Sequence, residues 1–346
     1  MEDQSAVTKV PDTKSKQNFW SKFQELRNKK IFPLAVLIAL LVVLFGAAGI
    51  SFALYQQPDN VLDSALKNAL TSKHVAFKGS LATSQAKAPL MVNFNGQAAQ
   101  QELASDLVVS AGSGAQAWKV SGSVVYDKTQ TLYLRLNGLD DLLTKSSGDN
   151  PQLKQVYGQI IAKINNIWFK LSKDDLNQMS GSSGDNILTC YQKFSDTLTA
   201  GSDQGKLTDL YSKHRFITIE KSLPDETING VSSFHYQLKI NPDQEKQFLN
   251  GLRQLDSVKK FETCSGGTFN AEAMANRSTT KDEKLEVWID KWSHAFTRLK
   301  QSDTTKDGTK ASFDSTFDFG KTVTITPPTK ATDLKDLFMQ FQTPTV

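Results

Sequence analysis

Residues 311–319 read Ala-Ser-Phe-Asp-Ser-Thr-Phe-Asp-Phe, and this short stretch decides the fold. Three phenylalanines, Phe313, Phe317 and Phe319, share one parity, while every residue of the opposite parity is Ser, Asp or Thr. Successive side chains of a β-strand point to opposite faces of the sheet. The alternation therefore predicts a strand with one buried face and one solvated face.

The same two-residue period recurs over most of the chain after residue 74. Asn229-Gly230, between two such segments, is a strong signal for a tight hairpin turn. Short polar connectors separate the segments, as in an antiparallel meander. The predicted strands lie at 75–81, 90–94, 107–109, 118–126, 132–136, 167–171, 216–228, 234–240, 285–289, 295–299 and 311–319, with a final edge strand at Val323 and Ile325 that Pro327-Pro328 ends.

Helical periodicity interrupts the strands. Residues 60–72 carry one apolar stripe, with Asn60 as the expected N-cap. Pro151 and Pro242 each open a further predicted helix. Others are expected near 186–199, 203–213 and 334–338. The predicted class is α+β: a strongly curved antiparallel sheet of about ten strands, with helices laid against one side of it in one core.

A second stretch, Ile31–Tyr55, contains no charged residue over its 25 positions. As a helix it would be about 37 Å long, which spans a hydrocarbon core of roughly 30 Å. Lys22, Arg27, Lys29 and Lys30 precede it, whereas residues 56–60 carry no Lys or Arg. The positive-inside rule then places the N-terminus in the cytosol and the rest outside.

This reading divides the chain into a cytosolic basic stub (1–30), a transmembrane helix (31–55) and an extracytoplasmic domain (56–346). A cleavable signal peptide is the alternative, because Ser51-Phe52-Ala53 resembles a small-residue cleavage site. We favour an uncleaved single-pass anchor in the cytoplasmic membrane, since the apolar core of a signal peptide usually has only about 7–15 residues.

The charge of the chain argues against a nucleic-acid partner. Seven of the 40 basic and four of the 36 acidic residues fall within the first 30 residues, and the anchor has none. The outer part therefore has 33 basic and 32 acidic residues, a net charge of +1. A nearly neutral domain lacks the basic surface that nucleic-acid binding requires.

Two cysteines, Cys190 and Cys264, lie in the predicted outer part. An even count in an oxidising compartment predicts one disulfide, although two unpaired buried thiols remain an alternative. No pair of histidines lies near either cysteine, so we expect no zinc site and no other metal.

Enzyme motifs are absent: the sequence has no H-E-x-x-H and no G-x-S-x-G. His235 and His294 fall on expected solvated strand faces, where a structural role is more common than catalysis. We therefore expect a protein that is not an enzyme and that takes no cofactor.

Several of the predicted strands resemble those of the LppX/LprG lipoproteins. Val287-Trp288-Ile289-Asp290, followed by His294 and Arg298, is similar to their "VWID…h…R" strand pair. The resemblance extends from about Asn60 to Pro328 and also includes Val125–Leu134, Gly230–Tyr236 and, as a closing strand, Gly320–Pro328. It implies a LolA-like half-barrel with helices across its concave side. The chain departs from these lipoproteins in having an anchor helix instead of a lipobox cysteine.

Members of that family hold acylated lipids in the concavity, so the resemblance implies that a lipid or other hydrophobic molecule binds here. The expected lining residues are Phe77, Leu132, Leu134, Phe234, Tyr236, Val287, Ile289, Phe313 and Phe317, each of which is also an ordinary core candidate. The alternative is an envelope scaffold or sensory ectodomain whose core is filled and whose surface binds proteins. The identity of any protein partner is left open.

Overall fold

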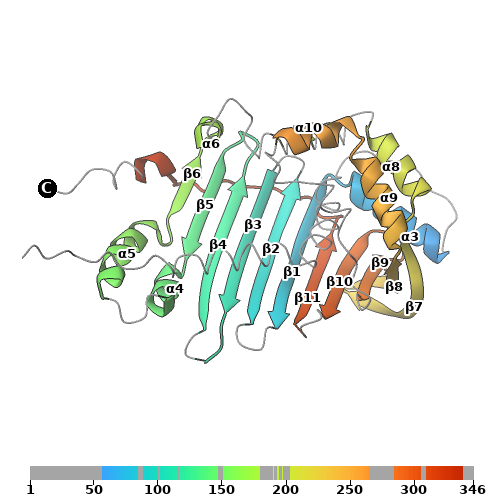
Figure 1. The fold of residues 1–346 in the computed structure, drawn as a ribbon, viewed down its shortest axis with the longest axis horizontal. Helices are drawn as coiled ribbons and strands as arrows, with labels where there is room; N and C mark the ends of the chain where they lie inside the picture. The colour runs from blue at the N-terminus through green and yellow to red at the C-terminus, as the bar shows by residue number, and fades with distance from the viewer. Residues whose placement is uncertain are drawn as a thin grey trace, which may run out of the picture.

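The fold is taken from a computed structural model of the chain (Figure 1). It describes residues 57–84, 89–99, 102–114, 117–146, 151–179, 190, 193–194, 197, 203–264, 284–304 and 309–337. The predicted stub and anchor lie outside these residues, as do most of the helix expected at 186–199 and part of the one at 334–338. None of the helices in the described ranges is long and apolar enough to cross a bilayer.

One twelve-stranded sheet organises the molecule, in the order β12-β6-β5-β4-β3-β2-β1-β11-β10-β9-β8-β7. It consists of two antiparallel meanders joined where β1 pairs with β11. The sheet is curved and does not close, because its two edge strands, β7 and β12, do not pair with each other. The α+β class is confirmed, and the sheet has twelve strands instead of about ten.

The first meander contains β1 (His74–Ser84), β2 (Leu90–Ala99), β3 (Glu102–Ala111), β4 (Trp118–Tyr126), β5 (Leu132–Asn137) and β6 (Trp168–Leu171). The second contains β7 (Ile217–Ile228), β8 (Val231–Ile240), β9 (Lys284–Asp290), β10 (Phe296–Thr304) and β11 (Lys310–Asp318). The two-residue strand β12 (Thr332–Asp333) pairs in parallel with β6. The register of β7 on β8 shifts twice, between Ile219 and Lys221 and between Leu223 and Glu226.

The helices gather at the two ends of the sheet (Figure 1). Near β7–β10 lie α3 (Pro58–Thr71), α8 (Asp203–Lys213) and α9 (Pro242–Leu252), and α10 (Asp256–Cys264) follows α9 and is drawn above the end of β1. Near β4–β6 lie α4 (Leu139–Ser146), α5 (Pro151–Ile164) and α6 (Lys173–Met179). Strands β6 and β7, which follow one another in the numbering of the strands, thus lie near opposite ends of the sheet, and α6 and α8 belong to the chain between them.

We call the sheet face that carries Phe313 and Phe317 the apolar face. The main hydrophobic core lies on it, where side chains of α3, α8, α9 and α10 meet those of β8–β11. Val61 of α3 and Val258 of α10 are fully buried there, as is Ile289 of β9. The alternation that predicted the strands thus arises because helices cover one face of this meander.

The segment 320–331 corrects one prediction. Val323 and Ile325 were expected to form an edge strand, but they belong to no strand and pack on the face opposite the apolar face. They form a small core with Ala99 and Val125, and the side-chain amide of Gln97 donates to the Thr324 carbonyl. Val323 and Ile325 are buried at alternate positions because their side chains pack onto a sheet face, without strand pairing. Pro327 and Pro328, which follow them, have no N–H groups to donate to a neighbouring strand.

The start of α3 differs from the expectation in a similar way. The helix begins at Pro58 with Gln57 at the N-cap, and Asn60 lies inside its first turn. Proline suits the first helical position because the missing N–H has no partner there in any case. By contrast, Asn241 caps α9 as its sequence suggests, accepting from the amides of Asp243 and Gln244.

Two local predictions are confirmed. Asn229 and Gly230 have φ values of 52° and 85°, as a tight hairpin turn of this sequence requires. Cys190 and Cys264 form a disulfide whose Cα atoms are 5.7 Å apart. The bridge fastens the end of α10 to the region between α6 and α8, and Cys190 is buried in the main core.

Two glycines make room for aromatic rings on the apolar face. A Cβ atom on Gly79 would stand 2.7 Å from the Phe94 ring, and one on Gly96 would stand 2.6 Å from the Phe77 ring. Phe94 in turn stacks on Phe313, with ring centroids 5.9 Å apart. Large rings and glycines thus alternate across β1, β2 and β11, which fills the face without separating the strands.

Candidate apolar ligand site

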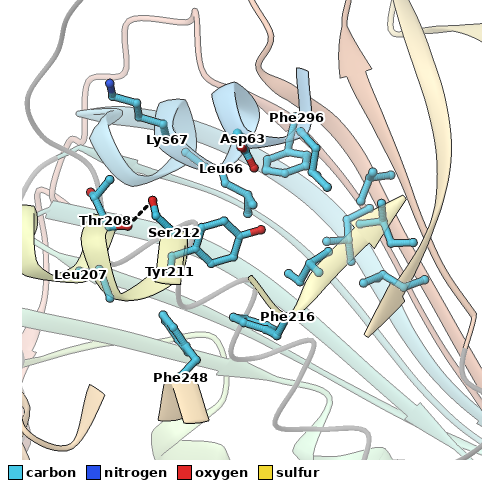
Figure 2. Close-up of a pocket in the computed structure, with 17 residues that line it drawn as sticks. Asp63, Leu66, Lys67, Leu207, Thr208, Tyr211, Ser212, Phe216, Phe248 and Phe296 are labelled. Atoms are coloured by element: carbon cyan, nitrogen blue, oxygen red, sulfur yellow. Dashed lines mark hydrogen bonds between the residues drawn. The ribbon is translucent and has the colours of Figure 1, made fainter. Parts of the chain in front are cut away.

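A pocket of about 170 Å³ lies between the helices and the apolar face of the second meander (Figure 2). Helices α3 and α8 form its outer wall, and strands β7–β10 form its floor. Most of the lining side chains are aliphatic or aromatic: Leu62, Leu66, Ala69, Leu207, Tyr211, Phe216, Ile217, Leu238, Phe248, Leu285, Val287, Phe296 and Leu299. Its polar lining residues, Asp63, Lys67, Thr208 and Ser212, come from the two wall helices.

The wall exists because α3 and α8 are amphipathic. On α3, Leu62 and Leu66 recur at a spacing of four residues, so both project from one side of the helix. Leu207 and Tyr211 repeat this spacing on α8. Figure 2 shows Leu66 and Tyr211 converging on the pocket from opposite helices. Behind them, Phe216 and Phe248 pack with ring centroids 4.9 Å apart.

Two titratable groups lie at this wall. Burial raises the pKa of Asp63, although the ion pair with Arg215 opposes this shift. Burial also raises the pKa of Tyr211 far above its ordinary value, and the Asp63 carboxylate adds to the effect. The Tyr211 hydroxyl therefore stays protonated. It is buried and has no hydrogen-bond partner among the described residues, so it is a donor available to a ligand in the pocket.

The size of the pocket limits what it admits. Pockets for drug-sized ligands usually enclose about 300–1,000 Å³, whereas an apolar cavity of about 150 Å³ accepts a molecule such as benzene. A cavity of about 170 Å³ therefore suits one ring or the end of one alkyl chain. Any larger ligand must leave part of its surface outside this pocket.

All nine residues expected from the sequence to line a ligand site lie on the apolar face, which they share across β1, β5, β8, β9 and β11. Only Val287 lines the pocket. Leu132 and Leu134 lie on β5, away from the main core. The other seven belong to the main core or pack against it: Phe77, Phe234, Tyr236, Val287, Ile289, Phe313 and Phe317.

Sequence reasoning missed the helical half of the pocket. Leu66, Tyr211 and Phe248 were visible only as members of amphipathic stripes, which usually mark core packing. The sequence does not show that two such stripes stand apart over the sheet and leave a space between them. The spacing of Leu207 and Tyr211 was the available signal, but it does not distinguish a filled core from a pocket.

The apolar face is less covered in the first meander. The pairing register places Leu107 of β3 and Leu136 of β5 on this face, both opposite Gly122 of β4. Leu107 is 39% exposed and Leu136 is 43% exposed. Aliphatic side chains of this size usually lose more of their surface on folding, so this part of the sheet presents a second apolar surface.

The "VWID…h…R" motif has a structural explanation on the opposite face. The rings of His235 and Trp288 stack with centroids 4.1 Å apart, and the Arg298 guanidinium lies 4.6 Å from the Trp288 ring centroid. Arg298 in turn donates to both carboxylate oxygens of Asp314, which raises the pKa of the arginine. His235 is only 7% exposed, so the expectation of a solvated histidine was wrong: the stack and Glu226 cover it.

No family model matches the chain, and no curated protein matches its sequence. Among solved structures, the chain is similar to the lipoprotein LppX of Mycobacterium tuberculosis, the lipoprotein that the strand motifs indicated. The identity is 12% and the TM-score 0.31, over 78% of this chain and all of LppX. A DUF1329 family protein of Desulfovibrio piger has 8% identity and a TM-score of 0.20, over 77% of this chain and 94% of that one. At these values the likeness carries no functional argument.

Proposed function

We propose that this protein binds a hydrophobic molecule of lipid type by enclosing one of its apolar ends in the pocket between α3, α8 and the sheet. The observation that carries the proposal is a cavity of about 170 Å³ that is lined mostly by aliphatic and aromatic side chains. Burying a hydrocarbon chain is favourable at roughly 0.8 kcal/mol per CH₂ group. The Tyr211 hydroxyl supplies one hydrogen-bond donor that fixes the orientation of a ligand oxygen.

In this proposal the sheet acts as a half-barrel with its apolar face on the concave side. Helices close the concavity over the second meander, and the first meander leaves it open. The exposed apolar side chains near Leu107 and Leu136 then support the part of a ligand that is too large for the pocket. The pocket and this exposed surface belong to the same sheet face, so a ligand hydrocarbon chain that extends out of the pocket stays in contact with apolar side chains.

We propose further that residues 31–55 hold this domain at the outer side of the cytoplasmic membrane. The support is the uncharged stretch, its basic N-terminal flank and the disulfide between Cys190 and Cys264. Disulfides persist mainly in oxidising compartments. A tethered lipid-binding domain would exchange its ligand with the bilayer beside it instead of travelling freely.

A second candidate function is protein binding by the open part of the apolar face. The exposure of Leu107 and Leu136 favours it, because apolar surfaces of this kind mark interaction sites. In that case the pocket would be a packing defect and would take up no ligand.

The first test is direct ligand detection. Residues 57–346 are secreted into an oxidising compartment without detergent, checked for cooperative unfolding, and extracted under denaturing conditions for lipid mass spectrometry. We expect one lipid per protein, or saturable uptake of a fluorescent fatty acid by protein that arrives empty. Empty protein that takes up no fatty acid would remove the basis of the proposal.

Two matched variants locate the site. Leu66→Trp fills the pocket from α3, and Leu107→Trp enlarges a side chain on the open part of the apolar face. We expect L66W to weaken fatty-acid binding at least about tenfold, the equivalent of about 1.4 kcal/mol. L107W alters only the surface that supports the ligand outside the pocket, so it should weaken binding less than L66W. A larger loss of fatty-acid binding in L107W than in L66W would place the site on the first meander. Binding of a protein partner that L107W disrupts and L66W does not would favour protein binding as the function.

A further inference from the structure

One tryptophan stands apart from the others in the described chain. Trp292, in the turn between β9 and β10, is 83% exposed, whereas Trp288 on the preceding strand is 2% exposed. Tryptophan is usually well buried, because its large apolar surface costs free energy in water. A ring that is almost fully in solvent calls for a partner outside the folded domain.

The turn that presents Trp292 is rigidly built. The Asp290 carboxylate accepts from the Trp292 amide at 2.7 Å and from the Ser293 hydroxyl at 2.7 Å. The Asp290 amide donates to the Ala295 carbonyl at 2.9 Å, and His294 adopts a φ of 51° that completes the reversal. Trp292 therefore projects from a fixed support, so little entropy is lost when its ring is ordered by a partner.

The turn is also fastened to α3. The side-chain amide of Asn68 lies 2.8 Å from the Ser293 carbonyl and 3.1 Å from the His294 carbonyl. Asn68 is ten residues, or about 15 Å of helix, from Pro58. The uncharged stretch ends at Tyr55, three residues and at most about 10 Å before Pro58. The turn thus lies within about 25 Å of chain from the expected anchor.

The charges near the turn suit a bilayer surface. Lys67, next to Asn68, and Lys73, just beyond the end of α3, are both exposed. Lys291 precedes Trp292, but it pairs with Asp225, which offsets its charge. Exposed tryptophan with lysine nearby is the combination that membrane interfaces favour: the ring lies at the headgroup level, and each lysine near an anionic surface adds about 1 kcal/mol.

We propose that the 290–295 turn docks on the outer surface of the bilayer that holds residues 31–55, with the Trp292 ring inserted among the lipid headgroups. The inference goes beyond ligand binding and does not depend on it. It gives the domain a second point of attachment, so that α3 is held at both of its ends: by the anchor before Pro58 and by the turn bound to Asn68.

This attachment would also orient the pocket. Phe296, which lines the pocket, follows the turn directly on β10, and Lys67 and Leu66 line it one and two residues before Asn68. Docking of Trp292 therefore brings the α3 side of the pocket towards the lipid surface. A hydrophobic ligand would then need to cross little water between the bilayer and the pocket.

The test uses the full chain reconstituted in vesicles of phosphatidylcholine and phosphatidylglycerol with brominated acyl chains, which quench tryptophan fluorescence on contact. Trp20→Phe is included in every sample, since residue 20 lies near the expected anchor. We expect quenching in this parent, loss of most of it in Trp292→Phe, and its retention in the matched control Trp118→Phe. We also expect lower accessibility of Trp292 to aqueous acrylamide in vesicles than in detergent.

Quenching that is unchanged by W292F would overturn the proposal, and so would a chain that fails to float with the vesicles. Folding is not at issue, because a ring that is 83% exposed contributes little to packing, and the melting temperatures of the parent and W292F should agree. Fatty-acid binding by the secreted fragment 57–346 is measured separately, so that a failure of docking can be distinguished from a failure of ligand binding. Loss of docking with normal ligand binding would refute only the docking proposal.

Discussion

The two meanders of the sheet share one sequence pattern but have different surroundings. In the second meander, β8–β10 turn their apolar residues towards α3, α8 and α9, and Val287 and Ile289 are almost fully buried. In the first, Leu107 and Leu136 keep 39% and 43% of their surface. Its better-buried side chains include Val125 on the opposite face, under the segment with Val323 and Ile325.

The difference shows that strand periodicity reports which residues share a face, while the environment of that face depends on distant segments. Helices α3, α8, α9 and α10 determine that the second meander has a thick core. A stretch without secondary structure at 320–331 gives the first meander a thin core on its other side. The following predictions test how far these two environments differ.

The largest expected effect is the contrast between Ile289→Ala and Leu136→Ala. Ile289 is fully buried beneath the helices, so its truncation should lower the free energy of unfolding by about 4 kcal/mol through lost burial and a new cavity. Leu136 is 43% exposed, and its truncation should cost less than about 1.5 kcal/mol. Urea unfolding of both variants measures the difference, and equal losses would mean that the two environments are alike.

The next effect concerns the disulfide that ties α10 into the covered end. Replacing both Cys190 and Cys264 by Ala removes a link across 74 positions and should lower the free energy of unfolding by about 3 kcal/mol. Fatty-acid binding should weaken as well, since the helical cover loosens. The wild type in a reducing buffer is the control, and it should behave like the double variant. If the midpoint of urea unfolding is the same in the double variant and the wild type, the disulfide contributes little to stability.

The thin core gives a smaller effect. Ile325→Ala should lower the free energy of unfolding by about 2 kcal/mol, the low end for a buried isoleucine, because its small cluster can collapse into the space left behind. The pocket lies on the other sheet face, so fatty-acid affinity should stay unchanged. A loss of binding in this variant would contradict the separation of the two faces.

The smallest effect is that of Asp203→Asn, and it depends on pH. The buried Asp203 carboxylate accepts from the Ser257 amide at the start of α10 and pairs with Lys206. Burial alone would raise its pKa, but the hydrogen bonds from Lys206 and Ser257 outweigh it and hold the pKa below the ordinary value of 3.8. At neutral pH the variant should lose about 1 kcal/mol of stability.

The sign of the pH dependence follows from that lowered pKa. A carboxylate with a depressed pKa in the folded state stabilises the protein above the unfolded pKa, and the contribution disappears as the pH falls through the folded value. The gap between wild type and D203N should therefore be constant above about pH 5 and close below pH 3.8. Thermal melts across this range measure it. A gap that widens on acidification would be inconsistent with the assigned hydrogen bonds.

Much of the fold was predictable because the strands of the sheet show an alternation of apolar and polar residues that can be read over a few positions. The phenylalanines of residues 311–319 gave the correct face of β11, and Asn229-Gly230 gave the β7–β8 turn, since both depend on backbone geometry over a few residues. The disulfide was also predictable, from the even number of cysteines and from the oxidising compartment that we expect for this part of the chain. The short helices α4 and α6 were missed, because elements of eight and seven residues carry too few turns for a periodic pattern.

The candidate site was less predictable. The nine expected residues share the apolar face, as their parity required, but whether a side chain there lies under a helix depends on contacts between segments more than 100 residues apart. His235 shows the same limit, since its burial comes from stacking on Trp288 of another strand. The pocket exists because α3 and α8 leave a space over the sheet, and the size of that space depends on how several distant segments pack together.

The two interruptions in the ladder between β7 and β8 have a consequence for how copies of the protein behave when crowded. Strand β7 is one of the two edge strands of the open sheet, and it also carries Pro224, which offers no N–H group. A kinked, charged rim of this kind is a poor template for intermolecular strand addition. The protein can thus keep its sheet unclosed without polymerising through it, and straightening this rim by replacing Pro224 would be the shortest route to fibrous aggregates.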